Sequence, residues 1–400
     1  MPSTDSRRIR RRRSIMPNRI RSGMLVISIF AILSAVNAFV PTTTPITAIG
    51  KKSNVESPAH IGPKNYARQS SFRRDTMVLT STQGAEIDTS AVNGGARPVL
   101  FPLPSISKLS ATLSKIGMMA FIVSMCLALP IALLPPHLLY RFNIISKVKQ
   151  QNMALSAGQF CARWMLRLFP FCKVSCHGSP EKETDPQPCV WVCNHTSALD
   201  IFILLAKDHE LRGKRKRPIK IVYWKGLEDN PITKLLFTQC GFIPVQMDGN
   251  AAGEANNYDM KSFKTLLKMS KQAFEEGFDI GILPEGQLNP HPDEKLLPCF
   301  PGAFTLAKMS RRPIRFMALH GTHRLWHARE DIGMTVTGRD IALRVYPGEG
   351  RKFKSADEFV TTFETVVGKF ATTGKDLAKD ELDAWLSGEK WKEISQKSKD

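Results

Sequence analysis

Two short polar segments of this chain carry side chains suited to acid–base chemistry. The first contains His195 and Asp200 and follows the apolar run Val190–Cys193; the second contains Glu285 and follows Ile280–Leu283. Each segment follows directly after a predicted buried strand. The ends of such strands are where an open α/β sheet commonly builds its active site. A histidine oriented by a carboxylate can remove a proton from a hydroxyl nucleophile, so the first segment predicts a general base.

The spacing of His195 and Asp200 restricts how they can meet. Five residues of a straight helix would place them about 140° apart around the axis. They approach only if His195 lies in a strand-to-helix turn and Asp200 in the first turns of the helix, which is predicted over Ser197–Ala206. A carboxylate on one ring nitrogen then leaves the other as base. The alternative on spacing alone is a helix cap beside an unrelated histidine and aspartate.

The elements that must position these residues alternate in the α/β manner from Pro188 onward. A helical pattern starts at Met260 and is stopped by Gly277, and the tail beyond Ala356 is predicted helical. The predicted strands are Val190–Cys193, Ile219–Trp224, Gly241–Val245, Asp279–Leu283, Ile314–Leu319 and Ile341–Tyr346.

The N-terminal part of the chain has the composition of a targeting sequence. Eight arginines precede an apolar stretch, Met24–Val40, in which small residues at 36–38 suit signal-peptidase cleavage. We therefore predict a signal peptide over 1–38 and a transit peptide or disordered linker over 39–95. The junction Ala38-Phe39 resembles that of bipartite plastid presequences, so a plastid is expected, with the endoplasmic reticulum as the alternative.

Two apolar segments predict membrane anchoring over 105–175. Ile116–Leu134 carries no charge, and its length barely spans a bilayer. It indicates a membrane-embedded helix or re-entrant hairpin, with a soluble core helix as the alternative. A second segment, Phe160–Phe171, is apolar on one face and is expected to lie in the interface.

The net charge of +20 does not by itself indicate nucleic-acid binding, because much of it lies in the N-terminal segment and no nucleic-acid motif is present. A basic cluster at 212–217 is interpreted as a solvated loop, with an anionic-lipid contact or a nucleic-acid site as alternatives. The eight cysteines form no Cys-x-x-Cys pair, which favours reduced thiols. A zinc site from Cys172, Cys176, Cys189 and Cys193 is an alternative.

Four blocks in a fixed order resemble the glycerolipid acyltransferase family, and especially its 1-acylglycerol-3-phosphate acyltransferase branch. The blocks are Asn194-His195-x4-Asp200, Gly241–Val245, Pro284-Glu285-Gly286 and Pro313-Ile314. The resemblance covers roughly residues 150–350 and includes Lys225, which sits where the family often has a lysine after its second strand.

The resemblance implies an α/β fold: a mixed sheet flanked by helices, a catalytic domain over 176–350, a helical tail over 351–400 and N-terminal membrane-associated helices. It implies that His195 is the general base and that Asp200 orients it. Substrate contacts are expected from Asn194, Lys225, Glu285, Gly286 and Gln287. The resemblance implies no metal and no cofactor. Acyl-CoA or an acyl carrier protein is expected as co-substrate.

Two departures from the family pattern concern the acceptor. Met247 and Leu288 stand where the family usually has arginines, and guanidinium groups suit bidentate phosphate capture. Lys225, Arg312 or Arg315 are candidate replacements. The fourth block also has Phe316 where a second proline is usual.

The expected function is a membrane-bound transfer of a fatty acyl group to the sn-2 hydroxyl of 1-acylglycerol-3-phosphate, giving phosphatidic acid. Expected partners are membrane lipids, a lysophospholipid acceptor and the acyl carrier, whose acidic surface would suit the basic cluster at 212–217. Alternatives are another lysophospholipid or a lysogalactolipid as acceptor, or a non-catalytic lipid-binding scaffold.

Overall fold

The computed structural model describes most of the chain from residue 108 onward. The predicted signal and transit segments (1–38 and 39–95) and Met247 lie outside the described residues. The described ranges are 108–169, 172–178, 187–213, 216–246, 260–326, 339–348 and 350–397.

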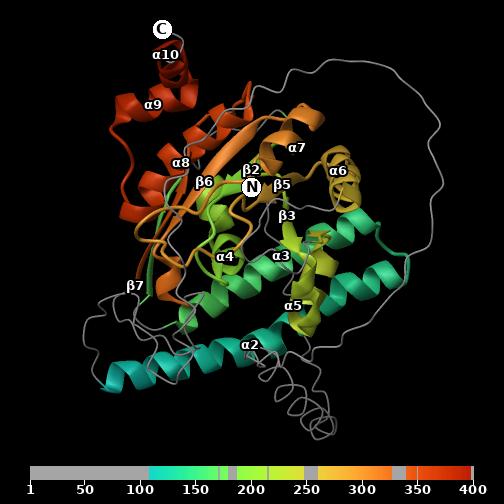
Figure 1. The fold of residues 1–400 in the computed structure, drawn as a ribbon. Coiled ribbons are helices and arrows are strands. Elements are labelled where there is room, and N and C mark those ends of the chain that lie inside the picture. Colours follow the sequence, from blue (N-terminus) through green and yellow to red (C-terminus); the bar gives the residue numbers. More distant parts are fainter. Residues whose placement is uncertain are drawn as a thin grey trace, which may run out of the picture. The chain divides into compact units, whose positions relative to one another are not determined.

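The described residues form one seven-stranded sheet in the order β1-β7-β6-β2-β5-β3-β4 (Figure 1). Neighbouring strands are parallel except β6 and β7, which are antiparallel. A mixed sheet flanked by helices is the predicted fold class, which is thus confirmed. The strands are β1 (Cys172–His177), β2 (Val190–Cys193), β3 (Ile219–Trp224), β4 (Ile243–Val245), β5 (Asp279–Ile282), β6 (Ile314–His320) and β7 (Arg339–Val345).

Helices cover both faces of this sheet (Figure 1). The α-helices are α2 (Lys108–Arg141), α3 (Lys147–Met165), α4 (Asp200–Arg212), α5 (Pro231–Cys240), α6 (Met260–Glu275), α7 (Gly302–Ser310), α8 (Ala356–Thr373), α9 (Lys379–Ser387) and α10 (Glu389–Lys397). Three 3₁₀ turns are also described: η1 (Leu166–Leu168), η2 (Lys225–Asp229) and η3 (Thr322–Arg324).

Strand β2 is buried on both faces and separates two hydrophobic cores. Trp191 and Cys193 point to a core shared with α2, α3, α4 and α5. Val190 and Val192 point to a second core shared with α6, α7 and α8. Alternate residues of a strand face opposite sides, so four consecutive apolar residues are what a central strand requires.

The sequence located β2 and β3 to the residue but missed β1, α5 and α7. Strand β1 is a half-exposed edge strand of mixed polarity, and its partner β7 is distant in sequence, so no local pattern identifies it. Helix α5 does carry local signals. Asn230 Oδ1 accepts hydrogen bonds from the N–H groups of Ile232 and Thr233, and Gly241 adopts a left-handed conformation at the C-terminus.

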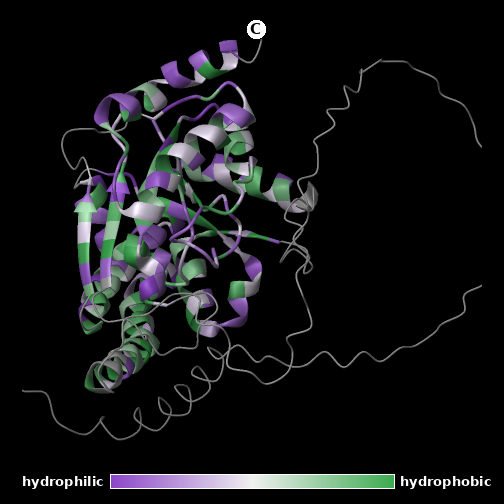
Figure 2. Ribbon diagram, turned by 60° about the vertical axis from the view of Figure 1, so that its left-hand side comes forward, coloured by the Kyte–Doolittle hydropathy of each residue, from purple (hydrophilic) through white to green (hydrophobic). Residues whose placement is uncertain are grey.

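Helix α2 is continuous through its three prolines, so the alternative of a re-entrant hairpin within 108–141 is wrong. Among the described helices, α2 is the one long and apolar enough to cross a membrane by length and composition, and 39% of its most apolar window is buried within the protein. Figure 2 shows the hydrophobic colouring of this helix, at the bottom of both views. The stripe that packs on the domain is Met118, Phe121, Ile122, Met125, Leu129 and Leu133.

The expected boundaries at 175/176 and 350/351 do not separate compact units, since 102–400 belongs to one unit. Strand β1 starts at Cys172, inside the expected anchor segment. Helix α8 contributes buried aromatic residues to the second core. The alternative zinc site is excluded by the strand order: the four cysteines belong to β1 and to β2 or the residue before it, and β7 and β6 lie between these strands.

Candidate active site

The loop after β2 brings His195 and Asp200 together, as the strand–turn–helix pattern predicted. His195 Nδ1 lies 2.9 Å from Asp200 Oδ2. Asp200 is the first residue of α4 and has no exposed surface, whereas 20% of the His195 side chain is exposed. The His195–Asp200 pair is therefore held at the carboxyl end of the central strand, with the histidine reaching the surface.

Asp200 is fixed by more than the histidine. Its Oδ2 also accepts hydrogen bonds from the N–H groups of Thr196 (2.7 Å) and Ser197 (2.9 Å). Because a carboxylate only accepts hydrogen bonds, Nδ1 of His195 carries the proton and Nε2 carries the lone pair. The arrangement presents Nε2 as a base and places a negative charge behind the imidazolium that forms when a proton is taken up.

Glu285 has no exposed surface, and its carboxylate is bonded to main-chain groups rather than open to a ligand. Oε1 accepts a hydrogen bond from the N–H of His195 (2.7 Å), and Oε2 accepts one from the N–H of Leu297 (2.9 Å). Burial raises the pKa of Glu285 from 4.5 to about 7, and the two N–H donors oppose that rise. The predicted contact of Glu285 with the acceptor stays a prediction.

Asn194 is also buried, and it extends the sheet past the end of β2. Its side chain donates to the carbonyl of Leu319 (2.9 Å) and accepts from the N–H of the same residue (2.7 Å). It therefore ties the catalytic loop to β6. Gly286 adopts φ 68°, a backbone region that favours glycine, and Gln287 is exposed beside it.

The strand register places Lys225 level with the catalytic loop. Trp191, Gly281 and Ile221 are paired across β2, β5 and β3. Four residues further along each strand come His195, Glu285 and Lys225. Two strand spacings of about 4.8 Å separate β2 from β3, so the strand ends that His195 and Lys225 follow are about 10 Å apart along the same edge. Its side chain is exposed and is a cation available at the catalytic edge.

The other two candidate cations lie at the opposite edge. Arg315 pairs with Trp191 in the register of β6 and β2, four residues before the level of His195, or about 13 Å along the strand. Arg312 precedes β6 and lies further away still. The suggestion that Arg312 or Arg315 replaces the missing arginines at the acceptor is therefore wrong.

Two residues of the site had no assigned role in the sequence. The N–H of Asn289 donates to the carbonyl of His195 (3.0 Å). Thr322, which follows β6, forms a hydrogen bond between its hydroxyl and that of Thr196. Position in the sequence was a signal for Thr322, because it comes two residues after β6, a neighbour of β2, and so reaches the same edge as His195. Asn289 lies seven residues after β5 and had no such signal.

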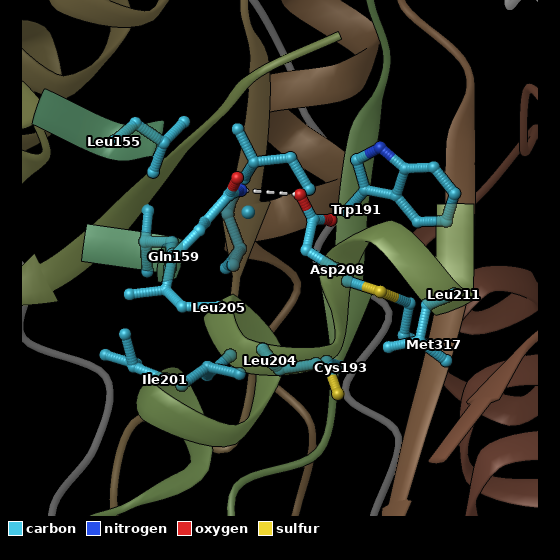
Figure 3. Close-up of a pocket in the computed structure, with 15 residues that line it drawn as sticks. Leu155, Gln159, Trp191, Cys193, Ile201, Leu204, Leu205, Asp208, Leu211 and Met317 are labelled. Carbon is cyan, nitrogen blue, oxygen red and sulfur yellow. Dashed lines mark hydrogen bonds between the residues drawn. The ribbon is translucent and has the colours of Figure 1, made fainter. Parts of the chain in front are cut away.

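A narrow apolar cavity of about 40 Å³ lies between the sheet, α3 and α4 (Figure 3). Its wall includes Cys193, Ile201 and Leu283. These residues lie within two positions of Asn194, Asp200 and Glu285, respectively. From Ile201 to Leu211 it follows α4 for about 15 Å. At the far end, Gln159 donates a hydrogen bond to Asp208 (2.7 Å).

The basic cluster at 212–217 is largely turned inward in its described part. Arg212 is bonded to Asp208 (2.7 Å) and approaches Asp279 (3.3 Å), and Lys216 is paired with Asp208. Only 4% of the Arg212 side chain and 14% of the Lys216 side chain are exposed. The interpretation of these two residues as a solvated loop or a carrier-docking patch is therefore wrong; they stabilise the amino-terminal edge of the sheet.

Comparison with known proteins gives concordant results. Residues 173–319 match a family model described as Acyltransferase. The chain is 26% identical over 160 residues to the chloroplastic 1-acyl-sn-glycerol-3-phosphate acyltransferase BAT2 of Brassica napus, covering 40% of this chain and 41% of that protein. It is 25% identical over 272 residues to the chloroplastic 1-acyl-sn-glycerol-3-phosphate acyltransferase LPAT1 of Arabidopsis thaliana, covering 66% of this chain and 64% of that protein.

A solved structure is also similar in fold: the 1-acyl-sn-glycerophosphate acyltransferase PlsC from Thermotoga maritima. The similarity has a TM-score of 0.49 at 17% identity and covers 68% of this chain and 99% of that one. This chain spans less than two thirds of the length of the two curated relatives. Residues 173–319 thus match the Acyltransferase family model, and the chain resembles the glycerolipid acyltransferases, as its motifs predicted.

Proposed function

We propose that this protein transfers a fatty acyl group from an acyl carrier protein or acyl-CoA to the sn-2 hydroxyl of 1-acylglycerol-3-phosphate, giving phosphatidic acid. The observation that carries the proposal is the geometry of His195: Nδ1 is bonded to buried Asp200, and Nε2 is left as a base. The names of the two curated relatives supply the choice of acceptor.

In the proposed reaction, Nε2 of His195 takes the proton of the acceptor hydroxyl while the oxygen attacks the thioester carbonyl carbon. Asp200 stabilises the imidazolium. The tetrahedral intermediate then collapses, the carbon–sulfur bond breaks, and the leaving thiolate takes the proton from His195. A cysteine-bound acyl intermediate is not part of the proposal. Cys193, next to the catalytic loop, is buried, and burial raises the pKa of its thiol well above the ordinary value.

The position and apolar lining of the cavity, rather than its volume, support a long-chain acyl donor. Its wall contains Ile201, which follows Asp200, and Leu283, which comes two residues before Glu285. A chain bound there would therefore lead from the catalytic edge along α4, with its carbonyl end near His195. Burying methylene groups in such a site is favourable by about 0.8 kcal/mol each.

Two features support membrane association and a plastid location. The side of α2 that does not pack on the domain exposes Leu109, Leu113, Ile116, Met119, Leu127, Ile131, Leu134 and Leu138. Apolar surface of this extent is unusual in a soluble monomer and suits lipid. The chloroplastic names of the relatives support a plastid, in agreement with the N-terminal composition.

The acceptor headgroup has a second candidate, because Leu288 and Met247 replace the arginines of the family pattern. Among the three cations suggested to replace them, only Lys225 lies at the catalytic edge. One lysine is a point charge, whereas an arginine grips phosphate with two hydrogen bonds. A lysophospholipid with a larger headgroup or a lysogalactolipid is therefore the alternative acceptor.

The test is acyl transfer by the membrane-reconstituted protein. Acyl-CoA and acyl carrier protein are offered with lysophosphatidate and with lysolipids of larger headgroup, and His195→Ala is the matched control. We expect product with lysophosphatidate and a loss of 100-fold or more in His195→Ala, as for removal of a general base. Equal rates in wild type and His195→Ala would contradict the mechanism. Faster transfer to larger headgroups would select the alternative acceptor.

A further inference from the structure

The main chain of the catalytic histidine is held on both sides by one loop, residues 283–301, which joins β5 to α7. The N–H of His195 donates to Glu285 Oε1 (2.7 Å), and its carbonyl accepts from the N–H of Asn289 (3.0 Å). Its ring is held separately, by Asp200. Peptide groups before and after the residue are thus fixed independently of the side chain, which leaves the imidazole little freedom to tilt.

The loop that supplies these contacts is itself closed by the same two residues. Glu285 Oε2 accepts a hydrogen bond from the N–H of Leu297 (2.9 Å). The side chain of Asn289 donates to the carbonyl of Lys295 (2.6 Å) and accepts from the N–H of His291 (2.9 Å). Glu285 has no exposed surface, and Asn289 is 1% exposed. Each residue therefore joins the fold of the loop to the position of His195.

A second connection braces the loop against the other side of the site. Asp293, within the same loop, lies 3.1 Å from Nε2 of buried His323. The preceding residue, Thr322, is hydrogen-bonded to Thr196, next to His195. The loop and η3 thus enclose the catalytic segment from both neighbouring strands, β5 and β6.

We propose that Glu285 and Asn289 are positioning residues for the acyl transfer, holding the His195 main chain so that Nε2 stays aligned with the acceptor hydroxyl. The inference rests on the proposed function. It differs from the expectation that Glu285 grips the glycerol portion of the acceptor. Both carboxylate oxygens already accept main-chain hydrogen bonds and are shielded from solvent, so the carboxylate acts on the reaction through His195.

The experiment compares Glu285→Gln, Asn289→Ala and Asn289→Asp with wild type. The glutamine replaces one accepting oxygen by an NH₂ group, so one of the two N–H donors loses its acceptor. The alanine removes both side-chain bonds of Asn289, whereas the aspartate keeps the one from His291 and sets a carboxylate oxygen against the carbonyl of Lys295. Glu294→Gln is the matched control, because Glu294 lies in the same loop with 69% of its side chain exposed.

Steady-state kinetics separate positioning from acceptor binding. Small displacements of a catalytic group lower the rate on the order of 10- to 100-fold. We expect Glu285→Gln and Asn289→Ala to lower kcat within that range while the acceptor KM changes less than about twofold. Asn289→Asp should lower kcat as well, because its carboxylate faces the Lys295 carbonyl, and Glu294→Gln should match wild type. A raised acceptor KM with kcat retained would overturn the proposal in favour of direct acceptor contact.

Amide hydrogen exchange gives a readout that does not depend on activity. We expect the amide of His195 or of Leu297, whichever loses its acceptor, to exchange at least about tenfold faster in Glu285→Gln than in wild type and Glu294→Gln. Thermal unfolding confirms that each variant is folded. Unchanged exchange, or unchanged kcat in an active enzyme, would overturn the positioning role. If wild type transfers no acyl group while the exchange difference is present, the proposed function fails and the structural role of Glu285 stands.

Discussion

Individual side chains at this site are of two kinds: some reach the surface, and others are buried and fix the position of the exposed ones. His195 and Lys225 are accessible at the catalytic edge, whereas Asn194, Asp200 and Glu285 are buried and bonded to main-chain groups. A buried carboxylate without a nearby cation is destabilised in its charged form, and N–H donors offset only part of that penalty. Glu285 is ionisable in this position because of its two main-chain donors.

The raised pKa of Glu285 predicts an unusual pH dependence of stability. The folded state binds the proton more tightly than the unfolded chain, so the favourable contribution is complete below pH 4.5 and is lost as pH rises to about 7. The shift corresponds to about 3 kcal/mol in the free energy of unfolding.

The check is urea denaturation of wild type and Glu285→Gln at pH 4.5 and pH 8. Because glutamine does not titrate, the stability of the variant relative to wild type should increase by about 3 kcal/mol between the two pH values. A constant difference would mean that the carboxyl of Glu285 titrates in the folded protein as it does in the unfolded chain.

At the scale of whole elements, helices α2 and α3 carry the exposed apolar surface that the proposed membrane contact would use. Helix α2 uses one apolar stripe to pack on the catalytic domain and leaves another exposed. A helix packed in this way along the domain has an outward side suited to lying against a bilayer. Phe160 and Trp164 of α3 are also exposed, and the interfacial location of this segment stays a prediction.

Charges on the outward side of α2 should release the protein from membranes. Ile116 is 59% and Ile131 is 70% exposed. Replacing both by aspartate adds the cost of placing carboxylates in an apolar layer, and we expect vesicle binding to weaken at least about tenfold.

The measurement is co-sedimentation with vesicles of mixed plastid-type lipids, with Ile394→Asp on α10 as control, since Ile394 is also exposed (41%). The control should bind as wild type does. Equal binding by the double variant would assign membrane attachment to another part of the chain.

At the scale of the whole molecule, the sheet is supported by two cores that come from different parts of the chain. The second core depends on α8, whose Phe359, Phe363, Val366 and Phe370 are buried against the sheet and α7. Phe316, where the family usually has a proline, packs edge-on against Phe363. Helix α8 of the predicted C-terminal tail is therefore part of the domain core.

Truncating Phe363 should destabilise the entire domain. Phe363 has no exposed surface. Loss of a buried aromatic ring costs about 3–5 kcal/mol, so Phe363→Ala should lower the free energy of unfolding by that amount. Met309→Ala, on α7 and 60% exposed, should change it by less than about 0.5 kcal/mol. Denaturant unfolding checks both values, and similar stability of the two variants would contradict an integral α8.

The sequence by itself determined the local features of this protein. Apolar runs bounded by polar segments located β2 and β3 to the residue, and the order of the four blocks predicted the resemblance to glycerolipid acyltransferases. The spacing of His195 and Asp200 required a strand-to-helix turn, which the structure contains. These features depend on neighbouring residues and on backbone periodicity, and both can be recognised within a short segment of sequence.

Only the tertiary structure decided which distant residues meet. Strand β2 lies between β5 and β6, so Glu285 and Leu319 reach the catalytic loop although they are 90 and 124 positions from His195. The pairing of β6 with β2 places Arg315 at the opposite edge of the sheet. Ion pairs with Asp208 and Asp279 hold Arg212 inward. Strand order and burial arise from packing of the whole chain, and no local pattern carries that information.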